Sequence, residues 1–276
     1  MNKVALITGA TRGIGRNIAH KLAKNGYNIV VAGKSIEDKP NLPGNIYTVA
    51  DEVETYGVKA LPVKTDVRHF DNIKKLVHET KKEFNRLDVV INNAGALWWQ
   101  PILDTPHERY DLVNDVNVRA SFLLSKYAIP LMLENGGGHI IMQSPPLPKN
   151  LSEANMVKNK TAYMISKWGM TLSALGVSAE YKSDGIAANT LWPSTPIESY
   201  ALINNNLGTN KMWRKADIIS DAVLEIVNED PNKFSGHQLI DEEYLRTKGY
   251  TDFTKYQCVN GHEPPKLNKL LDFIKN

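Results

Sequence analysis

Short apolar runs, many of them rich in Val and Ile, recur along the chain and alternate with stretches of helical periodicity. Runs this short, without strict polar alternation, are typical of strands covered on both faces of a sheet. The pattern predicts seven strands, of which the last is the weakest. They are Val4–Ile7, Ile29–Ala32, Ala60–Val63, Leu87–Ile91, His139–Met142, Ile186–Leu191 and His237–Ile240.

Between these runs, apolar residues recur every three or four positions, as on one face of a helix. Over residues 70–84 the apolar positions are Phe70, Ile73, Leu76, Val77 and Phe84, and this spacing predicts an amphipathic helix. Strands that alternate with helices predict an α/β Rossmann fold. The expected architecture is a doubly wound parallel sheet of seven strands with helices on both faces.

The Pro- and Gly-rich segments are too short to link domains. They cover residues 39–44, 145–149 and 193–196 and predict loops between sheet elements. We therefore expect a single domain over residues 1–276, in which residues 241–276 form a C-terminal extension without a clear period. This extension is expected to wrap the surface or to meet a partner subunit.

Composition places the chain among ordinary globular proteins. Its 276 residues are 42% hydrophobic and 23% charged, and the formal net charge is +3. Neither intrinsic disorder nor general nucleic-acid binding is therefore expected. The only cysteine, Cys258, excludes an intramolecular disulfide and a cysteine-based zinc site.

Targeting signals are not evident in the sequence. No stretch approaches the run of about 20 apolar residues that a membrane helix needs. The N-terminus lacks the charged and apolar regions of a secretory signal, and Ile274-Lys275-Asn276 is not a peroxisomal tail. The expected location is the cytoplasm.

A glycine-rich turn follows the first predicted strand: residues 8–15 read Thr-Gly-Ala-Thr-Arg-Gly-Ile-Gly, and a helical pattern comes next. Gly9, Gly13 and Gly15 permit a tight turn and a close approach of the backbone to a pyrophosphate. The helix start adds free N–H groups and the positive end of its dipole. A tight strand–helix turn without a ligand could show similar glycines, but the position after the first strand favours a dinucleotide site.

The spacing Thr-Gly-x-x-x-Gly-x-Gly resembles that of the short-chain dehydrogenase/reductase family, and four further family motifs follow in order. Asp66 follows the third strand, residues 92–95 read Asn-Asn-Ala-Gly after the fourth, and Asn117 lies on the next long helix. Tyr163 and Lys167 form a Tyr-x-x-x-Lys pair on the helix after the fifth strand. The resemblance runs from residue 3 to about residue 240 and implies a nicotinamide-dependent oxidoreductase.

Four stretches resemble one subgroup of this family more closely. They are residues 44–48 (Gly-Asn-Ile-Tyr-Thr), 144–147 (Ser-Pro-Pro-Leu), 191–193 (Leu-Trp-Pro) and 239–242 (Leu-Ile-Asp-Glu). In that subgroup a lipid-carrier domain follows the dehydrogenase domain, and none is expected within these 276 residues.

The end of the second strand predicts which nicotinamide cofactor is used. Enzymes that prefer NAD usually place a carboxylate there for the ribose 2′-hydroxyl, whereas residues 32–35 read Ala-Gly-Lys-Ser. Lys34 and Arg12 supply positive charge and Ser35 a donor, which suit the 2′-phosphate of NADP(H), although both cations could simply be solvated. By resemblance, the expected cofactor-binding residues are Gly9, Thr11, Arg12, Gly13, Ile14, Gly15, Lys34, Asp66, Val67, Asn93, Ala94, Gly95, Tyr163, Lys167, Pro193 and Ile197.

Tyr163 and Lys167 are the expected catalytic pair, four residues apart on one helix face. A free tyrosine keeps its proton up to a pH of about 10, but a nearby ammonium and the oxidised nicotinamide favour the phenolate and lower its pKa. The resemblance implies that Lys167 also holds the nicotinamide ribose and that Asn117 supports a water chain to that lysine. A Tyr–Lys pair at this spacing is also common on amphipathic helices without a catalytic role.

A serine after the fifth strand is the fourth catalytic member in the family. Family strands commonly end in Ser-Ser and use the second serine, whereas residues 143–145 here read Gln-Ser-Pro. Ser144 is therefore the candidate, and Pro145 occupies the usual place. The alternative is a Ser144 hydroxyl that bonds only to local backbone.

The loops after strands four, five and six build the substrate pocket in the family. Here they carry aromatic and methionine side chains, which predict an apolar, adaptable pocket for a hydrophobic ketone or aldehyde. Several of these side chains could instead pack in the core or at a subunit interface. They are Trp98, Trp99, Leu147, Met156, Trp192, Leu202, Met212 and Trp213.

Together these features predict an NADP(H)-dependent oxidoreductase that interconverts an alcohol and a carbonyl group, with carbonyl reduction as the expected direction. The expected partners are a small-molecule substrate and further copies of the chain, as a dimer or tetramer by family analogy. Nucleic acid, a metal and a membrane span are not expected. The rival hypothesis is a non-catalytic NADP(H)-binding sensor or scaffold, because Pro145 stands in the usual serine position.

Overall fold

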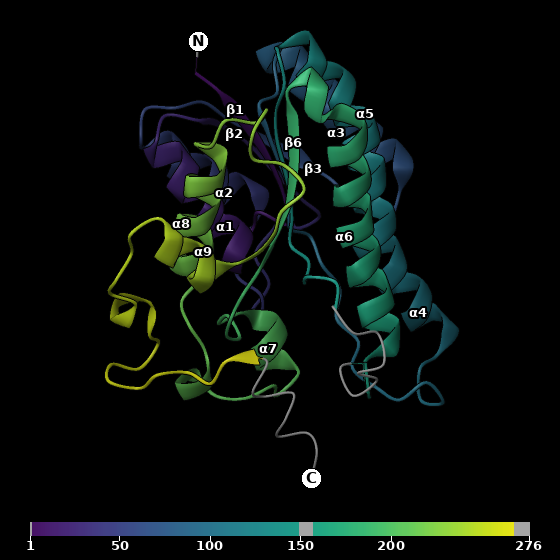
Figure 1. The fold of residues 1–276 in the computed structure, drawn as a ribbon. Coiled ribbons are helices and arrows are strands. Elements are labelled where there is room, and N and C mark those ends of the chain that lie inside the picture. The colour runs from purple at the N-terminus through teal and green to yellow at the C-terminus, as the bar shows by residue number, and fades with distance from the viewer. Residues whose placement is uncertain (1, 149–156, 268–276) are drawn as a thin grey trace.

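A single parallel sheet of seven strands runs through the computed structural model, which describes residues 2–148 and 157–267 (Figure 1). The strand order is β3-β2-β1-β4-β5-β6-β7, so the direction of winding reverses between β1 and β4. At such a switch point the loops at the carboxyl ends of the strands separate and leave a crevice for a ligand. The strands are β1 (Val4–Thr8), β2 (Asn28–Gly33), β3 (Ala60–Lys64), β4 (Val89–Asn92), β5 (Gly138–Met142), β6 (Ile186–Trp192) and β7 (Gln238–Ile240).

The predicted fold class is confirmed, and each of the seven predicted strands is present. The largest shift is in β4, which begins at Val89 rather than at Leu87. Asp88 explains the difference, because its carboxylate accepts the backbone N–H of Val4 at 2.8 Å. A side chain thus takes the place of a strand carbonyl at this end of the ladder.

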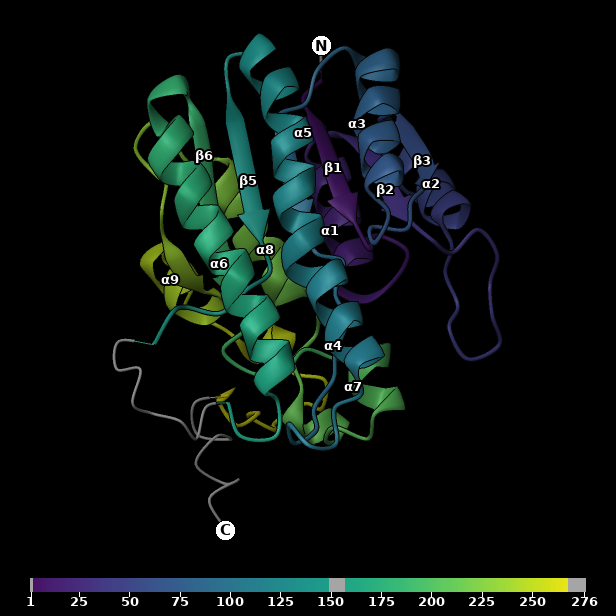
Figure 2. The ribbon, with the colours of Figure 1, turned by 90° about the vertical axis from the view of Figure 1, so that its right-hand side faces the viewer.

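Helices cover both faces of the sheet (Figures 1 and 2). Because successive strand residues point to opposite faces, Ala5 and Ile7 enter one core and Val4 and Leu6 the other. The first face carries α1 (Gly13–Lys24), α2 (Ile46–Glu54) and α8 (Asp217–Val227), and the second carries α3 (Phe70–Phe84), α5 (Ala120–Glu134) and α6 (Thr161–Tyr181).

The helix predicted over residues 70–84 is α3, with Ile73 and Leu76 buried as the pattern requires. Shorter helices, α4 (His107–Asn114) and α7 (Tyr200–Asn204), lie near the carboxyl ends of the strands (Figure 1). A π-helical turn over Asp115–Arg119 joins α4 to α5. Within the described ranges, no helix is long and apolar enough to cross a membrane.

The chain after β7 packs back onto its own core. It begins with α9 (Asp241–Thr247), a helix too short to give a readable period in the sequence. Tyr244 and Phe253 are both 5% exposed, and the Tyr250 hydroxyl donates to a Glu225 carboxylate oxygen at 3.0 Å. These aromatic side chains anchor the described part of the extension to the face that carries α8.

The same extension holds the loop that follows β6. A carboxylate oxygen of Asp241 accepts the Ser194 N–H at 2.8 Å, and the Leu267 N–H donates to the Ser194 carbonyl at 2.7 Å. Arg214, only 1% exposed, pairs with Glu242 at 2.6 Å and also with Glu263. Loop and extension therefore form one hydrogen-bonded unit.

Asp241 makes the stability of this unit depend on pH. Burial raises the pKa of Asp241 to about 6, even though two backbone N–H groups bond to its carboxylate. In the unfolded chain the pKa is about 3.9, so the folded state favours the protonated acid. The contribution of Asp241 to the free energy of unfolding is therefore fully present below a pH of about 4. It falls by about 3 kcal/mol as the pH rises through 6.

We expect Asp241→Asn to match the wild type in unfolding free energy near pH 4, and to exceed it by about 2 to 3 kcal/mol near pH 8. The reason is that an amide keeps an acceptor for the Ser194 N–H without a charge to bury. Urea unfolding at both pH values measures the difference. Asp51→Asn, on the exposed side of α2, is the control, and an equal difference at both pH values would contradict the prediction.

Candidate active site

The glycine turn is shaped by close contacts that exclude side chains. Gly9 and Gly13 have φ angles of 67° and 54°, which favour glycine. A β-carbon on Gly15 would lie 2.4 Å from the Gly9 carbonyl oxygen and 2.5 Å from Asn93 Nδ2. Arg12 precedes α1 without any side-chain cap, so the first N–H groups of the helix are available to an anion.

Asn93 and Thr8 join two of the predicted motifs across the switch point. Asn93 Nδ2 donates to the Thr8 carbonyl at 2.9 Å and to the Gly9 carbonyl at 3.3 Å. In return, Thr8 Oγ1 accepts the backbone N–H groups of Asn93 and Ala94, each at 3.1 Å. The Asn-Asn-Ala-Gly segment after β4 therefore fixes the shape of the glycine turn after β1.

Positive charge gathers where β2 ends. Arg12 Nη2 donates to Ser35 Oγ at 2.8 Å and to the Gly44 carbonyl at 2.9 Å, while Lys34 is exposed beside them. Burial lowers the pKa of Arg12 from its ordinary value, but an arginine remains charged at neutral pH. Arg12, Lys34 and Ser35 thus lie together, as the sequence predicted for a 2′-phosphate.

Asp66 is paired within its own loop after β3. Its carboxylate accepts two guanidinium N–H groups of Arg68, one of them at 2.5 Å, and this contact lowers the pKa of Asp66 to about 2. Val67, the next residue, is half-buried. The carboxylate is therefore ionised, and its contact with the adenine stays a prediction.

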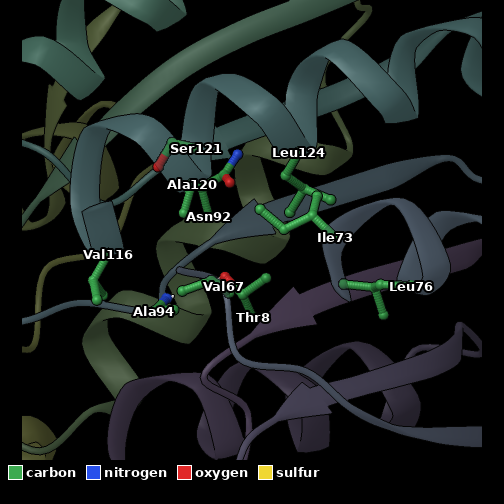
Figure 3. Close-up of a pocket in the computed structure, with 10 residues that line it drawn as sticks. All are labelled: Thr8, Val67, Ile73, Leu76, Asn92, Ala94, Val116, Ala120, Ser121 and Leu124. Atoms are coloured by element: carbon green, nitrogen blue, oxygen red, sulfur yellow. Dashed lines mark hydrogen bonds between the residues drawn. The ribbon is translucent and has the colours of Figure 1, made fainter. Parts of the chain in front are cut away.

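A small enclosed cavity lies at the carboxyl ends of β1 and β4, beside α3 and α5 (Figure 3). It encloses about 10 Å³, which is at the lower limit for one water molecule and far too small for a nicotinamide cofactor. The Asn92 amide nitrogen, buried and without a partner among the residues described, contributes to its lining. The cavity is bounded by Thr8, Val67, Ile73, Leu76, Asn92, Ala94, Val116, Ala120, Ser121 and Leu124.

The Tyr163 and Lys167 side chains lie near one another on α6, and both are buried, at 8% and 5% exposure. Lys167 Nζ donates to the Gln143 carbonyl at 2.8 Å and lies 5.9 Å from the centre of the Tyr163 ring. Burial lowers the pKa of Lys167 to about 8 and raises that of Tyr163 above its usual value. Burial alone therefore favours a neutral phenol, beside a lysine whose proton is unusually easy to remove.

Asn117 is fully buried in the π-helical turn before α5. Its amide accepts the Ala96 N–H at 2.9 Å and donates to the Ala96 carbonyl and to Ser166 Oγ. A β-carbon on Gly95 would lie 3.6 Å from Asn117 Oδ1 and 3.7 Å from Lys167 Nζ. Both atoms therefore border the same glycine, so Asn117 lies close to the predicted catalytic lysine.

Ser144 has a different setting from the other candidates. Its side chain is 0% exposed, and its hydroxyl lies 2.9 Å from that of Thr171, which also bonds to the Pro145 carbonyl at 2.7 Å. Thr171 lies about two turns beyond Tyr163 along α6. This setting favours a packing role for Ser144, and its catalytic role stays a prediction.

The predicted pocket residues differ in their settings. Trp213 is 6% exposed and donates its indole N–H to the Leu207 carbonyl, so it packs inside its own loop. Trp99 meets Tyr163 edge to face, with ring centres 6.2 Å apart, and Trp192 lies 5.8 Å from Lys167 Nζ. Trp98, Leu147, Leu202 and Met212 are half-buried, and Met156 lies outside the described residues.

A model of the short chain dehydrogenase family matches residues 3–200. The match begins just before β1 and ends at the start of α7, so it spans the glycine turn, the Asn-Asn-Ala-Gly segment and the Tyr163–Lys167 pair. The chain belongs to the short chain dehydrogenase family. The resemblance predicted from five ordered motifs is confirmed, and so is the oxidoreductase class that it implied.

Relatives of this short chain dehydrogenase include hydroxysteroid dehydrogenase-like protein 2 from Xenopus tropicalis. The two are 42% identical over 257 residues, which are 93% of this chain and 60% of that protein. This chain thus spans between about half and three-fifths of the length of the curated relatives it matches. The four stretches at residues 44–48, 144–147, 191–193 and 239–242 predicted this subgroup, and the prediction is confirmed.

Solved structures agree with the family assignment. A proposed dehydrogenase from Xanthomonas campestris is 36% identical, with a TM-score of 0.89 and coverage of 95% of both chains. A metagenomic short-chain oxidoreductase in complex with NADP is 27% identical, with a TM-score of 0.71, and the match covers 86% of this chain and 96% of that one. The Rossmann architecture is thus that of the short chain dehydrogenases.

Three residues near the site were not anticipated from the sequence. Thr171 holds Ser144, Arg214 fixes the loop after β6, and Lys160 lies 5.3 Å from the centre of the Trp99 ring. Of these, only Lys160 could have been found from the sequence, because it stands three residues before Tyr163 and so lies one helical turn from it. No cluster of metal-ligating side chains occurs in residues 2–148 and 157–267 of this short chain dehydrogenase.

Proposed function

We propose that this chain is an NADP(H)-dependent oxidoreductase that reduces the carbonyl group of a small hydrophobic ketone or aldehyde to an alcohol, with Tyr163 as the acid/base. The observation that carries the proposal is that Tyr163, Lys167 and Asn117 lie close together at the Asn-Asn-Ala-Gly segment, which is itself hydrogen-bonded to the glycine turn. Family membership and the complex of a related oxidoreductase with NADP support it.

The residues around the glycine turn fit a dinucleotide. A β-carbon on Gly13 would meet nothing closer than Ser199 at 3.9 Å, so the backbone is open on the side where the uncapped start of α1 presents its N–H groups. Arg12, Lys34 and Ser35 suit the 2′-phosphate, and we expect Pro193 and Ile197, in the loop after β6, to border the cofactor. NADPH, when bound, supplies a hydride to the carbonyl carbon.

Tyr163 provides the proton that balances the hydride. Burial keeps the phenol protonated, and a phenol that delivers its proton to the carbonyl oxygen leaves a phenolate beside the Lys167 ammonium. Because burial lowers the pKa of Lys167 to about 8, this lysine can in turn return a proton to the phenolate. Asn117 Oδ1 borders the same glycine as Lys167 Nζ. This position suits a chain of water molecules that returns a proton to Lys167.

Arg12 is expected to select the cofactor. Arg12→Ala should raise the Kd for NADPH by about 10- to 100-fold, because it removes a charge-assisted hydrogen bond to a phosphate. The Kd for NADH, which has no 2′-phosphate, should change much less. Fluorescence titration of both cofactors measures the ratio, with Lys39→Ala on the exposed neighbouring loop as a control. Equal weakening of both cofactors would show that Arg12 only supports the turn through Gly44.

A non-catalytic NADP(H)-binding sensor or scaffold is the second candidate function. The observation that favours it is the setting of Ser144, which is buried against Thr171 while Pro145 occupies the usual serine position. NADPH oxidation with a panel of ketones, quinones and aldehydes separates the two candidates. Turnover that disappears in Tyr163→Phe supports the enzyme, whereas tight NADPH binding without turnover supports the sensor.

The remaining expectations are part of this proposal. We propose that the chain works as a single domain, assembled into a homo-oligomer in the cytoplasm. The oligomer rests on family analogy. Light scattering of the purified protein measures its mass.

A further inference from the structure

Lys160 places a positive charge close to the candidate acid. It stands at the start of α6, about one turn before Tyr163. Its Nζ lies 5.3 Å from the centre of the Trp99 ring, and that ring contacts Tyr163 edge to face at 6.2 Å between centres. Ammonium, indole and phenol therefore form one continuous group that ends at the candidate acid.

The position of Lys160 is unfavourable for a cation. The side chain is half-buried, and burial lowers the pKa of Lys160 from its ordinary value. The start of a helix also carries the positive end of its dipole, which disfavours an ammonium. By contrast, the half-buried Lys21 and the buried Arg214 are paired with carboxylates, whereas Lys160 has no acidic partner within the described part of the chain.

The indole rings of Trp98 and Trp99 add N–H groups that have no hydrogen-bond acceptor among the described residues. The Nε1 atoms of Trp98 and Trp99 are buried and, across the residues that the structure places, have no hydrogen-bond partner. Buried donors left unpaired are uncommon and costly. The Arg109 guanidinium lies 4.8 Å from the centre of the Trp98 ring. At the loop after β4 and the start of α6, one ammonium and two indole N–H groups thus lie without a hydrogen-bond acceptor among the described residues.

We propose that the substrate is a carbonyl compound with an apolar or aromatic body that carries one carboxylate, bound by the Lys160 ammonium and the Trp99 indole N–H. This inference rests on the proposed function and names its substrate class. One ammonium and one neutral donor match a singly charged group, and the aromatic faces match the body that separates it from the carbonyl. The reaction is unchanged: hydride reaches the carbonyl carbon and the Tyr163 proton reaches its oxygen.

The competing explanation is that Lys160 only stabilises the loop by its contact with Trp99. Two aldehydes of almost the same shape separate the explanations: 4-carboxybenzaldehyde and its methyl ester, methyl 4-formylbenzoate. The readout is the ratio of kcat/KM for the acid to kcat/KM for the ester. If Lys160 has only a structural role, its replacement changes kcat/KM for both substrates by the same factor and leaves the ratio unchanged.

We expect the wild type to prefer the acid. Lys160→Met should lower the acid-to-ester ratio by about 10- to 100-fold, mainly through KM for the acid, because a charge-assisted hydrogen bond is lost. Lys160→Arg should restore much of the ratio. Lys158→Met is the matched control, since Lys158 is exposed two residues earlier and should leave the ratio as in the wild type.

A wild type that prefers the ester, or a ratio that Lys160→Met does not change, overturns the inference while turnover still supports the proposed function. If neither aldehyde is turned over with NADPH, the proposed function fails for this substrate class. Calorimetric binding of 4-carboxybenzaldehyde to the NADPH-loaded protein then decides the inference by itself. Binding that Lys160→Met weakens supports it, and binding that is absent or insensitive to Lys160→Met overturns it.

Discussion

Replacing Tyr163 by Phe is expected to lower kcat for carbonyl reduction by about 100- to 10,000-fold, the usual contribution of a positioned acid/base. The substitution removes one hydroxyl and keeps the ring that packs against Trp99. Lys167 retains its bond to the Gln143 carbonyl, so NADPH should bind with nearly the same Kd. Chemistry and cofactor binding are thereby separated in one variant.

Steady-state NADPH oxidation gives kcat, and fluorescence titration gives the Kd for NADPH. Tyr181→Phe is the matched control because it removes a hydroxyl from the last residue of the same helix, far from Lys167. A Tyr163→Phe enzyme with wild-type kcat would exclude the phenol as the acid. A variant that also lost NADPH binding would point instead to a disturbed site.

Gly15→Ala is expected to have the second-largest effect. Its β-carbon would collide with the Gly9 carbonyl oxygen at 2.4 Å and with Asn93 Nδ2 at 2.5 Å, and the first of these is backbone that cannot move without opening the turn. We expect the unfolding free energy to fall by about 1 to 3 kcal/mol, as overpacking commonly costs. The Kd for NADPH should rise by at least about 100-fold, since the displaced turn loses several hydrogen bonds to the phosphates.

Gly176→Ala provides the comparison. Gly176 also lies within a helix, α6, but a β-carbon there would meet nothing within 4 Å. This variant should gain about 0.5 to 1 kcal/mol, the helix preference of alanine over glycine. Urea unfolding and NADPH titration of both variants make the test, and normal binding by Gly15→Ala would refute the proposed place of the pyrophosphate.

Local patterns explain what the sequence could predict. The strands, α3 and the glycine turn depend on residues that are neighbours in the chain, and each has a periodicity or spacing that can be read directly. Tyr163 and Lys167 belong to the same class, because four residues on one helix fix their mutual position. The family resemblance then placed Asn117 beside them.

Tertiary pairs explain what the sequence could not predict. No residue near Ser144 in the sequence indicates that its hydroxyl will bond to Thr171. The pairing of Arg214 with Glu242 likewise depends on the position of the segment after β7. Trp99 and Trp213 look equivalent in the sequence, yet one contacts Tyr163 and the other bonds to the Leu207 carbonyl. Such contacts depend on packing between distant segments, which no local pattern encodes.

The attachment of the loop after β6 to the C-terminal extension has a consequence for control of the enzyme. Ser194 is bonded on one side to Asp241 and on the other to Leu267, so the loop proposed to border the nicotinamide cannot swing outward alone. Loss of these two hydrogen bonds is therefore expected to change how fast NADP⁺ leaves. The lifetime of the product complex would then depend on the C-terminal extension as well as on the residues of the site.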